Sequence, residues 1–142
     1  MNIFRYIPYM GFLLVFYNIL SSRSKFSWNH DWIIFHLPSD STVTLSYSEG
    51  IIAVGLLVLF IEIVKATTVT NFAIFEQVLS VLVFVAFLMQ FLNSGRTAEP
   101  TLLILTLMSL IEVLAGFVIL TKVAMRDISS VSYTHLTLPT KA

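Results

Sequence analysis

Four long apolar stretches constrain this sequence more than any other feature. They cover residues 3–20, 47–64, 72–92 and 101–121, and polar segments separate them. A helix needs about 20 apolar residues to cross the roughly 30 Å of hydrocarbon in a bilayer. Because 57% of the residues are hydrophobic and only 11% are charged, the chain is too apolar for an ordinary soluble domain. The sequence therefore predicts an all-α membrane protein, in which residues 1–130 form a single four-transmembrane-helix bundle.

The first stretch has an alternative interpretation as a cleaved signal peptide, since one basic residue precedes an apolar run. Against cleavage, Ser21–Ser24 provides no clear small-x-small site, and Asn18 interrupts the apolar core. The first two stretches are short for spans, and we expect Arg5 and Lys65 to extend from their ends toward the membrane surface. We therefore predict that residues 3–20 cross the membrane.

Charge and cysteine content exclude several functions. Eight Lys and Arg residues balance eight Asp and Glu residues, so no basic face is available for nucleic acid. The absence of cysteine excludes disulfides, thiolate metal sites and thiol nucleophiles. Glycine-rich phosphate loops, serine elbows and nucleophile–base arrangements are also missing from the sequence. We therefore expect no enzyme activity and no cofactor. The expected partners are the lipid bilayer and either another membrane protein or a second copy of this chain.

The loop between the first two spans, residues 21–46, carries the pattern of a β-hairpin. Apolar and polar residues alternate over 33–37 and again over 43–47, with a PSDS turn between them. We expect this hairpin to lie on the membrane surface. Ser46 and Glu49 have the spacing of a capping box that starts the second helix, so Glu49 needs no catalytic role.

His30, Asp31 and His36 lie in the same loop, and the two histidines could face one side of a strand. A third well-placed ligand is not evident, and histidines beside Trp28 and Trp32 are more often ordinary surface residues. We therefore predict no metal site there.

Basic residues near the span ends predict the orientation. With the N-terminus inside, the cytoplasmic segments hold the larger share, namely Arg5, Lys65, Lys122 and Arg126, while the outer segments hold Arg23, Lys25 and Arg96. This excess predicts that the N- and C-termini are cytoplasmic and that residues 21–46 form the outer loop.

Each predicted span carries one stripe of small and polar residues among Leu, Val, Ile and Phe. In lipid, small residues allow close backbone approach, and polar side chains must bond to one another. The stripes should therefore meet inside the bundle. The candidate intramembrane polar cluster consists of Glu62, Glu76, Glu112, Asn18, Ser80 and Gln90.

The three carboxyl groups of this cluster differ in their predicted depth. Glu62 and Glu76 lie roughly one turn from the cytoplasmic connection between their helices, whereas Glu112 lies about midway along its span. Glu62 is a candidate ion-pair partner of Lys65, which follows it by three residues. Glu112 has no basic residue within a turn, so we expect it to be neutral and to donate a hydrogen bond across the bundle.

Two functions fit these residues. The first is a small structural or accessory subunit of a membrane complex, in which the polar residues hold helices together or dock a partner. The alternative is a proton- or cation-coupled small transporter that uses Glu62, Glu76 and Glu112. Small four-span multidrug exporters resemble this chain in length and topology. Their members use a glutamate inside the first helix, where this chain has Asn18.

A closer resemblance rests on Phe60–Thr67 (FIEIVKAT) and on the segments 107–108, 111–113 and 115–117. These resemble a group of uncharacterised four-span inner-membrane proteins of proteobacteria, over most of the chain up to about Ser130. The resemblance implies a bacterial inner-membrane location and no assigned activity.

The last residues differ in character from the rest of the chain. Val131–Thr140 reads VSYTHLTLPT, which resembles one reading frame of a common transposon-end sequencing adapter over its whole length. We expect residues 131–142 to be an adapter-derived artefact and disordered, although an ordinary disordered tail is the alternative. On this interpretation His135 and Lys141 carry no functional weight, and the natural end of the chain after Ser130 is left open.

Overall fold

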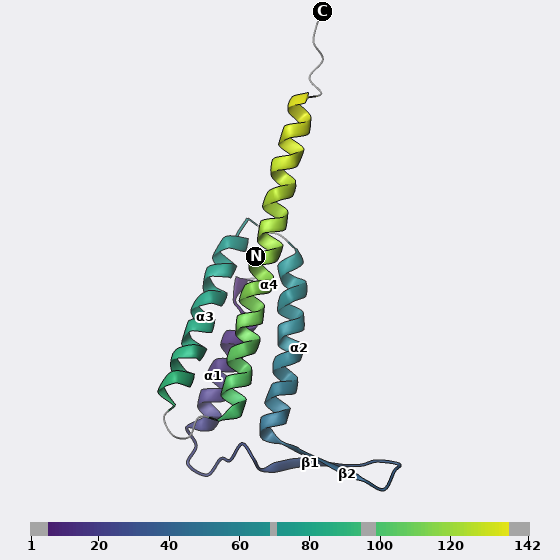
Figure 1. The fold of residues 1–142 in the computed structure, drawn as a ribbon. Coiled ribbons are helices and arrows are strands. Elements are labelled where there is room, and N and C mark those ends of the chain that lie inside the picture. Colours follow the sequence, from purple (N-terminus) through teal and green to yellow (C-terminus); the bar gives the residue numbers. More distant parts are fainter. Residues whose placement is uncertain (1–5, 69–70, 95–98, 137–142) are drawn as a thin grey trace, which may run out of the picture.

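The computed structural model describes residues 6–68, 71–94 and 99–136, with side chains described as far as residue 132. The elements, in chain order, are α1 (Tyr9–Ser21), β1 (Asp31–His36), β2 (Thr42–Ser46), α2 (Tyr47–Thr67), α3 (Ala73–Asn93) and α4 (Pro100–Leu136). The four helices run side by side, and the hairpin of β1 and β2 projects sideways from one end of the bundle (Figure 1). The connection between α2 and α3 lies at the opposite end. The predicted helical architecture with a small hairpin between the first two helices is confirmed.

Three of the helices are long and apolar enough to cross a membrane, namely α2, α3 and the part of α4 up to Ser132. The first predicted span is wrong in its extent, because α1 begins at Tyr9 and has 13 residues. Pro8 explains this start, since proline lacks an N–H and disfavours helical geometry in the residue before it. The predicted residues 3–5 lie outside the described part of the chain.

The fourth helix is longer than the sequence predicted. It continues past residue 121 to Leu136, so the expectation of disorder is wrong for residues 131–136, and residues 137–142 lie outside the described part. Residues 117–138 contain neither Gly nor Pro, so nothing in this stretch forces the helix to stop. The last turns of α4 extend well beyond the ends of the other helices (Figure 1).

The hairpin is antiparallel, with Ile33 opposite Leu45 and Phe35 opposite Val43. These four apolar side chains therefore share one face. The turn places Asp40 at a φ of 58°, a left-handed conformation that Asp tolerates better than most residues. Strand β2 leads directly into α2 through the predicted capping box. In it, Glu49 Oε2 accepts a hydrogen bond of 2.6 Å from the Ser46 backbone N–H.

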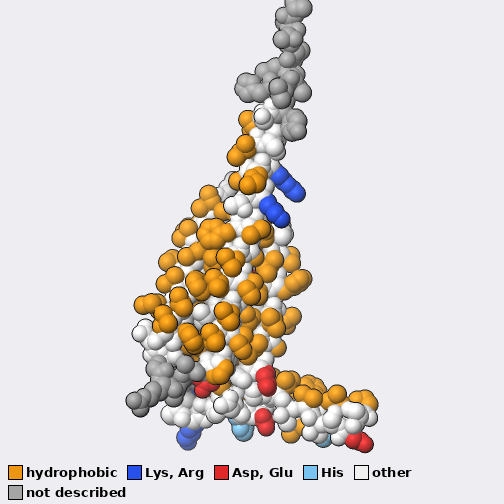
Figure 2. Space-filling model, viewed as in Figure 1, with side chains coloured by type: hydrophobic (Ala, Val, Ile, Leu, Met, Phe, Trp, Pro, Cys, Tyr) orange, Lys and Arg blue, Asp and Glu red, His pale blue; other side chains and the backbone are white. Residues whose placement is uncertain are grey.

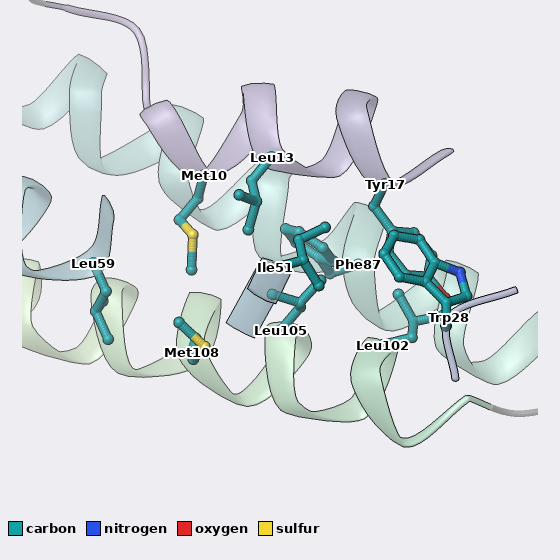
Figure 3. Close-up of a cluster of buried hydrophobic side chains, with 10 residues drawn as sticks. All are labelled: Met10, Leu13, Tyr17, Trp28, Ile51, Leu59, Phe87, Leu102, Leu105 and Met108. Atoms are coloured by element: carbon teal, nitrogen blue, oxygen red, sulfur yellow. The ribbon is translucent and has the colours of Figure 1, made fainter. Parts of the chain in front are cut away.

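The buried core lies where the four helices meet and continues to the hairpin end of the bundle (Figure 3). Gly55 faces α4, where a Cβ would lie 2.8 Å from Met108 Cε and 3.3 Å from Leu105 Cδ2, so a side chain there would require these neighbours to shift. At the hairpin end, the ring of Trp28 stacks on Tyr17 at 4.7 Å and donates its indole N–H to Ser21 Oγ at 3.1 Å. The core is formed by Met10, Leu13, Tyr17, Trp28, Ile51, Leu59, Phe87, Leu102, Leu105 and Met108.

The outer surface of the bundle is also apolar. Large hydrophobic side chains are exposed on all four helices, among them Phe16, Leu57, Leu82 and Leu114. On the face drawn in Figure 2, hydrophobic side chains cover most of the helical surface, and charged side chains gather near the two ends of this zone. Such an exposed apolar area is far larger than soluble monomeric proteins carry.

Candidate functional site

The Glu62 carboxylate lies inside the bundle near the end of α2 and is only 4% exposed. Its Oε2 atom is 2.8 Å from Lys65 Nζ, so the candidate ion pair is present. Its Oε1 atom accepts the backbone N–H of Tyr9, the first residue of α1. Pro8, which precedes Tyr9, has no side chain that could cap the helix. Glu62 therefore acts as the N-terminal cap of a different helix, where the positive end of the helix dipole favours a carboxylate.

Lys65 also binds the chain at the start of α1. Its Nζ donates to the Ile7 carbonyl at 3.2 Å and lies 4.7 Å from the centroid of the Tyr9 ring. Just before Ile7, the ring of Tyr6 packs edge-on against Phe72 at 5.2 Å. The Glu62–Lys65 pair thus fixes the start of α1 beside the end of the bundle where α2 and α3 connect.

Glu112 is the buried carboxyl group between α3 and α4. It is 6% exposed, and its Oε1 accepts a hydrogen bond of 2.9 Å from Ser80 Oγ. Its Oε2 is the one buried side-chain polar atom without a hydrogen-bond partner among the residues that the structure describes. Buried polar atoms are nearly always hydrogen-bonded, so an exception requires an explanation.

A glutamine that the sequence analysis missed joins α3 to α4 beside Glu112. Gln77 Nε2 donates to the Val113 carbonyl at 3.0 Å. Gly116 makes room for this amide, because a Cβ at that position would overlap Gln77 Oε1. Gly116, a small residue within the apolar fourth span, is the sequence signal for this contact, because small residues allow close approach of a neighbouring helix.

A cavity of about 40 Å³ lies among these groups. It is bounded by α2, α3, α4 and Pro8, which precedes α1. Glu76 also borders it, from the first turn of α3, where the helix dipole favours an acidic residue. The polar residues that line the cavity include Glu62, Lys65, Glu76, Gln77, Ser80 and Glu112.

Asn18 and Gln90 form a separate polar contact between α1 and α3. Asn18 Nδ2 donates to Gln90 Oε1 at 3.0 Å, and Gln90 Nε2 donates back to Asn18 Oδ1 at 2.8 Å. Neither residue lines the cavity beside Glu112. The six residues predicted as one cluster therefore form two groups. Ser80 and Gln90 are ten positions apart, which corresponds to roughly 15 Å along a helix, so sharing a face does not bring them together.

The loop histidines take ordinary structural positions. His30 stacks on Tyr47 with ring centroids 6.0 Å apart, and His36 is exposed at the end of β1. Among the residues with described side chains, 6–68, 71–94 and 99–132, no group of three His, Cys, Asp or Glu residues is placed to hold a metal ion.

Comparison with protein-family models, curated proteins and solved structures finds no match to this chain. The resemblance to four-span inner-membrane proteins and the resemblance of the tail to a sequencing adapter therefore stay predictions.

Proposed function

We propose that this chain is a four-span integral membrane protein of the bacterial inner membrane. The support is its apolar outer surface together with three helices of spanning length. The short α1 fits the same arrangement, because it runs from one end of the bundle toward the other. It starts beside Glu62, near the end of α2, and it ends at Ser21, which bonds to Trp28 at the hairpin end. As part of this proposal, both termini lie in the cytoplasm and the hairpin lies on the outer face, as the distribution of basic residues predicts.

Cysteine labelling tests this topology, because the chain has no cysteine of its own. Ser39→Cys in the hairpin turn and Ser129→Cys in the last part of α4 both alter exposed positions. A membrane-impermeant maleimide added to intact spheroplasts should label Ser39→Cys and should label Ser129→Cys only after the membrane is opened. Labelling of both variants in intact spheroplasts, or release of the protein by carbonate, would contradict the proposal.

Within the membrane, the proposed role is that of a small structural or accessory subunit. One observation carries this role: the polar groups between the helices are mostly engaged in joining one helix to another. Both oxygens of Glu62 are used to hold α1 and Lys65, and Asn18 and Gln90 satisfy each other. Such contacts stabilise a bundle in lipid and leave few groups available for a substrate.

Cross-linking in native membranes tests the subunit role. A reproducible cross-link to a larger membrane protein, found with the wild-type chain and with the exposed control variant Ser129→Ala, is the expected result. A homodimer alone, together with proton flux through the purified protein, would contradict it.

Proton-coupled transport is the second candidate, and the unpartnered Oε2 of Glu112 favours it. The full chain in proteoliposomes that contain a pH-sensitive dye separates the two functions. A carrier should admit protons after an external acid pulse and should lose this flux in Glu112→Gln. A subunit should show no flux in either protein.

A further inference from the structure

We infer that Glu112 is a protonated carboxyl group that shares its cavity with ordered water, which makes it an exchangeable proton-binding site. This inference concerns the occupancy of the site. It holds whether the protein serves a complex or carries protons itself, and it does not depend on the direction in which the chain crosses the membrane.

The first step is the hydrogen bonding of Glu112. The hydroxyl of Ser80 donates to Oε1 at 2.9 Å, and Oε2 is buried without a partner. A buried carboxylate with a single hydrogen bond and no paired cation is costly. A neutral carboxyl group resolves this cost, because it accepts at Oε1 and donates from Oε2.

The second step is the space beside this group. A water molecule needs roughly 10–15 Å³ of cavity volume and two to four polar partners. The cavity measures about 40 Å³, and Gln77 and Glu76 line it together with Glu112. Water therefore fits. A metal ion does not, since the described residues contain no group of three acidic, histidine or cysteine ligands placed to hold one.

The third step is the charge around the cavity. From α2, Glu62 and Lys65 face the cavity as an ion pair whose net charge is zero. From α3, Glu76 faces it, and α4 contributes Glu112 as its acidic group. The segment before α1 contributes Pro8, which has no charge. Among the described residues that line the cavity, no unpaired cation is present that would hold Glu112 as a permanent carboxylate.

The fourth step is access. Thr68, the residue after the last turn of α2, also lines the cavity. The cavity therefore extends from Glu112 to the end of the bundle where α2 and α3 connect. Water can exchange along this route without crossing the apolar core around Met108 and Leu105.

Carbodiimide labelling tests the inference on the full chain in membranes. Dicyclohexylcarbodiimide takes up the proton of a carboxylic acid on one nitrogen, and the carboxylate oxygen adds to the central carbon. The adduct then rearranges to a stable acylurea that peptide mass spectrometry locates. We expect the adduct on Glu112 and not on Glu62, which is paired with Lys65. Glu112→Gln should abolish it, whereas Ser109→Ala, a buried change on the same helix, should keep it.

The pH dependence of labelling tests the water. A site in contact with water loses its proton as the pH rises, so the yield at Glu112 should fall severalfold from acidic to alkaline conditions. A yield that does not change with pH would show a carboxyl group sealed from water and would overturn the inference. Absence of the adduct at every pH, in wild type and in Ser80→Ala alike, would overturn it as well.

Discussion

The carboxylate of Glu62, in the last part of α2, accepts the backbone N–H of Tyr9, the first residue of α1, 53 positions earlier in the chain. Through this contact an acid inside an apolar helix becomes the cap of a neighbouring one. Lys65 completes the arrangement by bonding to the carboxylate and to the Ile7 carbonyl.

Replacement of Glu62 should therefore loosen α1. Glu62→Ala removes the cap and leaves Lys65 without its carboxylate, so we expect a loss of about 2–4 kcal/mol in the free energy of unfolding. Glu62→Gln keeps an acceptor for the Tyr9 N–H and should lose less. Unfolding of the purified variants in detergent, followed by circular dichroism, measures both. Equal losses in the two variants would contradict the capping role.

The amide pair between α1 and α3 should behave as one unit. Asn18→Leu and Gln90→Leu each leave one amide without its partner, whereas the double variant leaves none. We expect a coupling energy of about 0.5–1.5 kcal/mol. A double-mutant cycle of unfolding free energies measures it, and strictly additive effects would show that the two amides do not interact.

Close approach of α2 and α4 should depend on Gly55. In Gly55→Val the added side chain meets Met108, Leu105 and Leu13, and we expect a loss of about 1–3 kcal/mol from overpacking. Gly50→Val on the same helix is the matched control. Its Cβ would lie 3.8 Å from Trp32, an ordinary contact, so its stability should stay near that of wild type.

The contact between Gly116 and Gln77 offers a test by rescue. Gly116→Ala pushes the Gln77 amide out of its place beside Val113, so we expect a loss of about 1–2 kcal/mol. Adding Gln77→Ala removes the obstructing amide. The double variant should therefore lose less stability than the two single losses added together. Thermal unfolding measures all three proteins. An additive result would show that the two residues do not contact each other.

The helices and the hairpin could be predicted because each has a local signature. Long apolar runs indicated α2, α3 and α4, and the period-two alternation around the PSDS turn indicated β1 and β2. The start of α1 was missed although Pro8 marks it. The prediction followed the apolar composition of that region and gave too little weight to the backbone restriction that proline imposes.

The polar site was predictable only in part. Glu62 and Lys65 are three residues apart, so their pairing follows from helix geometry alone. The bond from Glu62 to Tyr9 involves a backbone N–H, which leaves no trace in side-chain identity. Ser80 and Glu112 could be assigned to the interior, but their mutual contact depends on how α3 and α4 are shifted along their axes.

The brevity of α1 has a consequence for the surrounding lipid. Its 13 residues reach roughly 20 Å, while α2 and α3, with 21 residues each, reach about 32 Å. In a bilayer, the annular lipids beside α1 therefore meet a shorter hydrophobic wall than those beside the other helices, and their acyl chains must compress or tilt on that side only. A bilayer that surrounds the bundle would then be thinner beside α1 than beside α2 and α3.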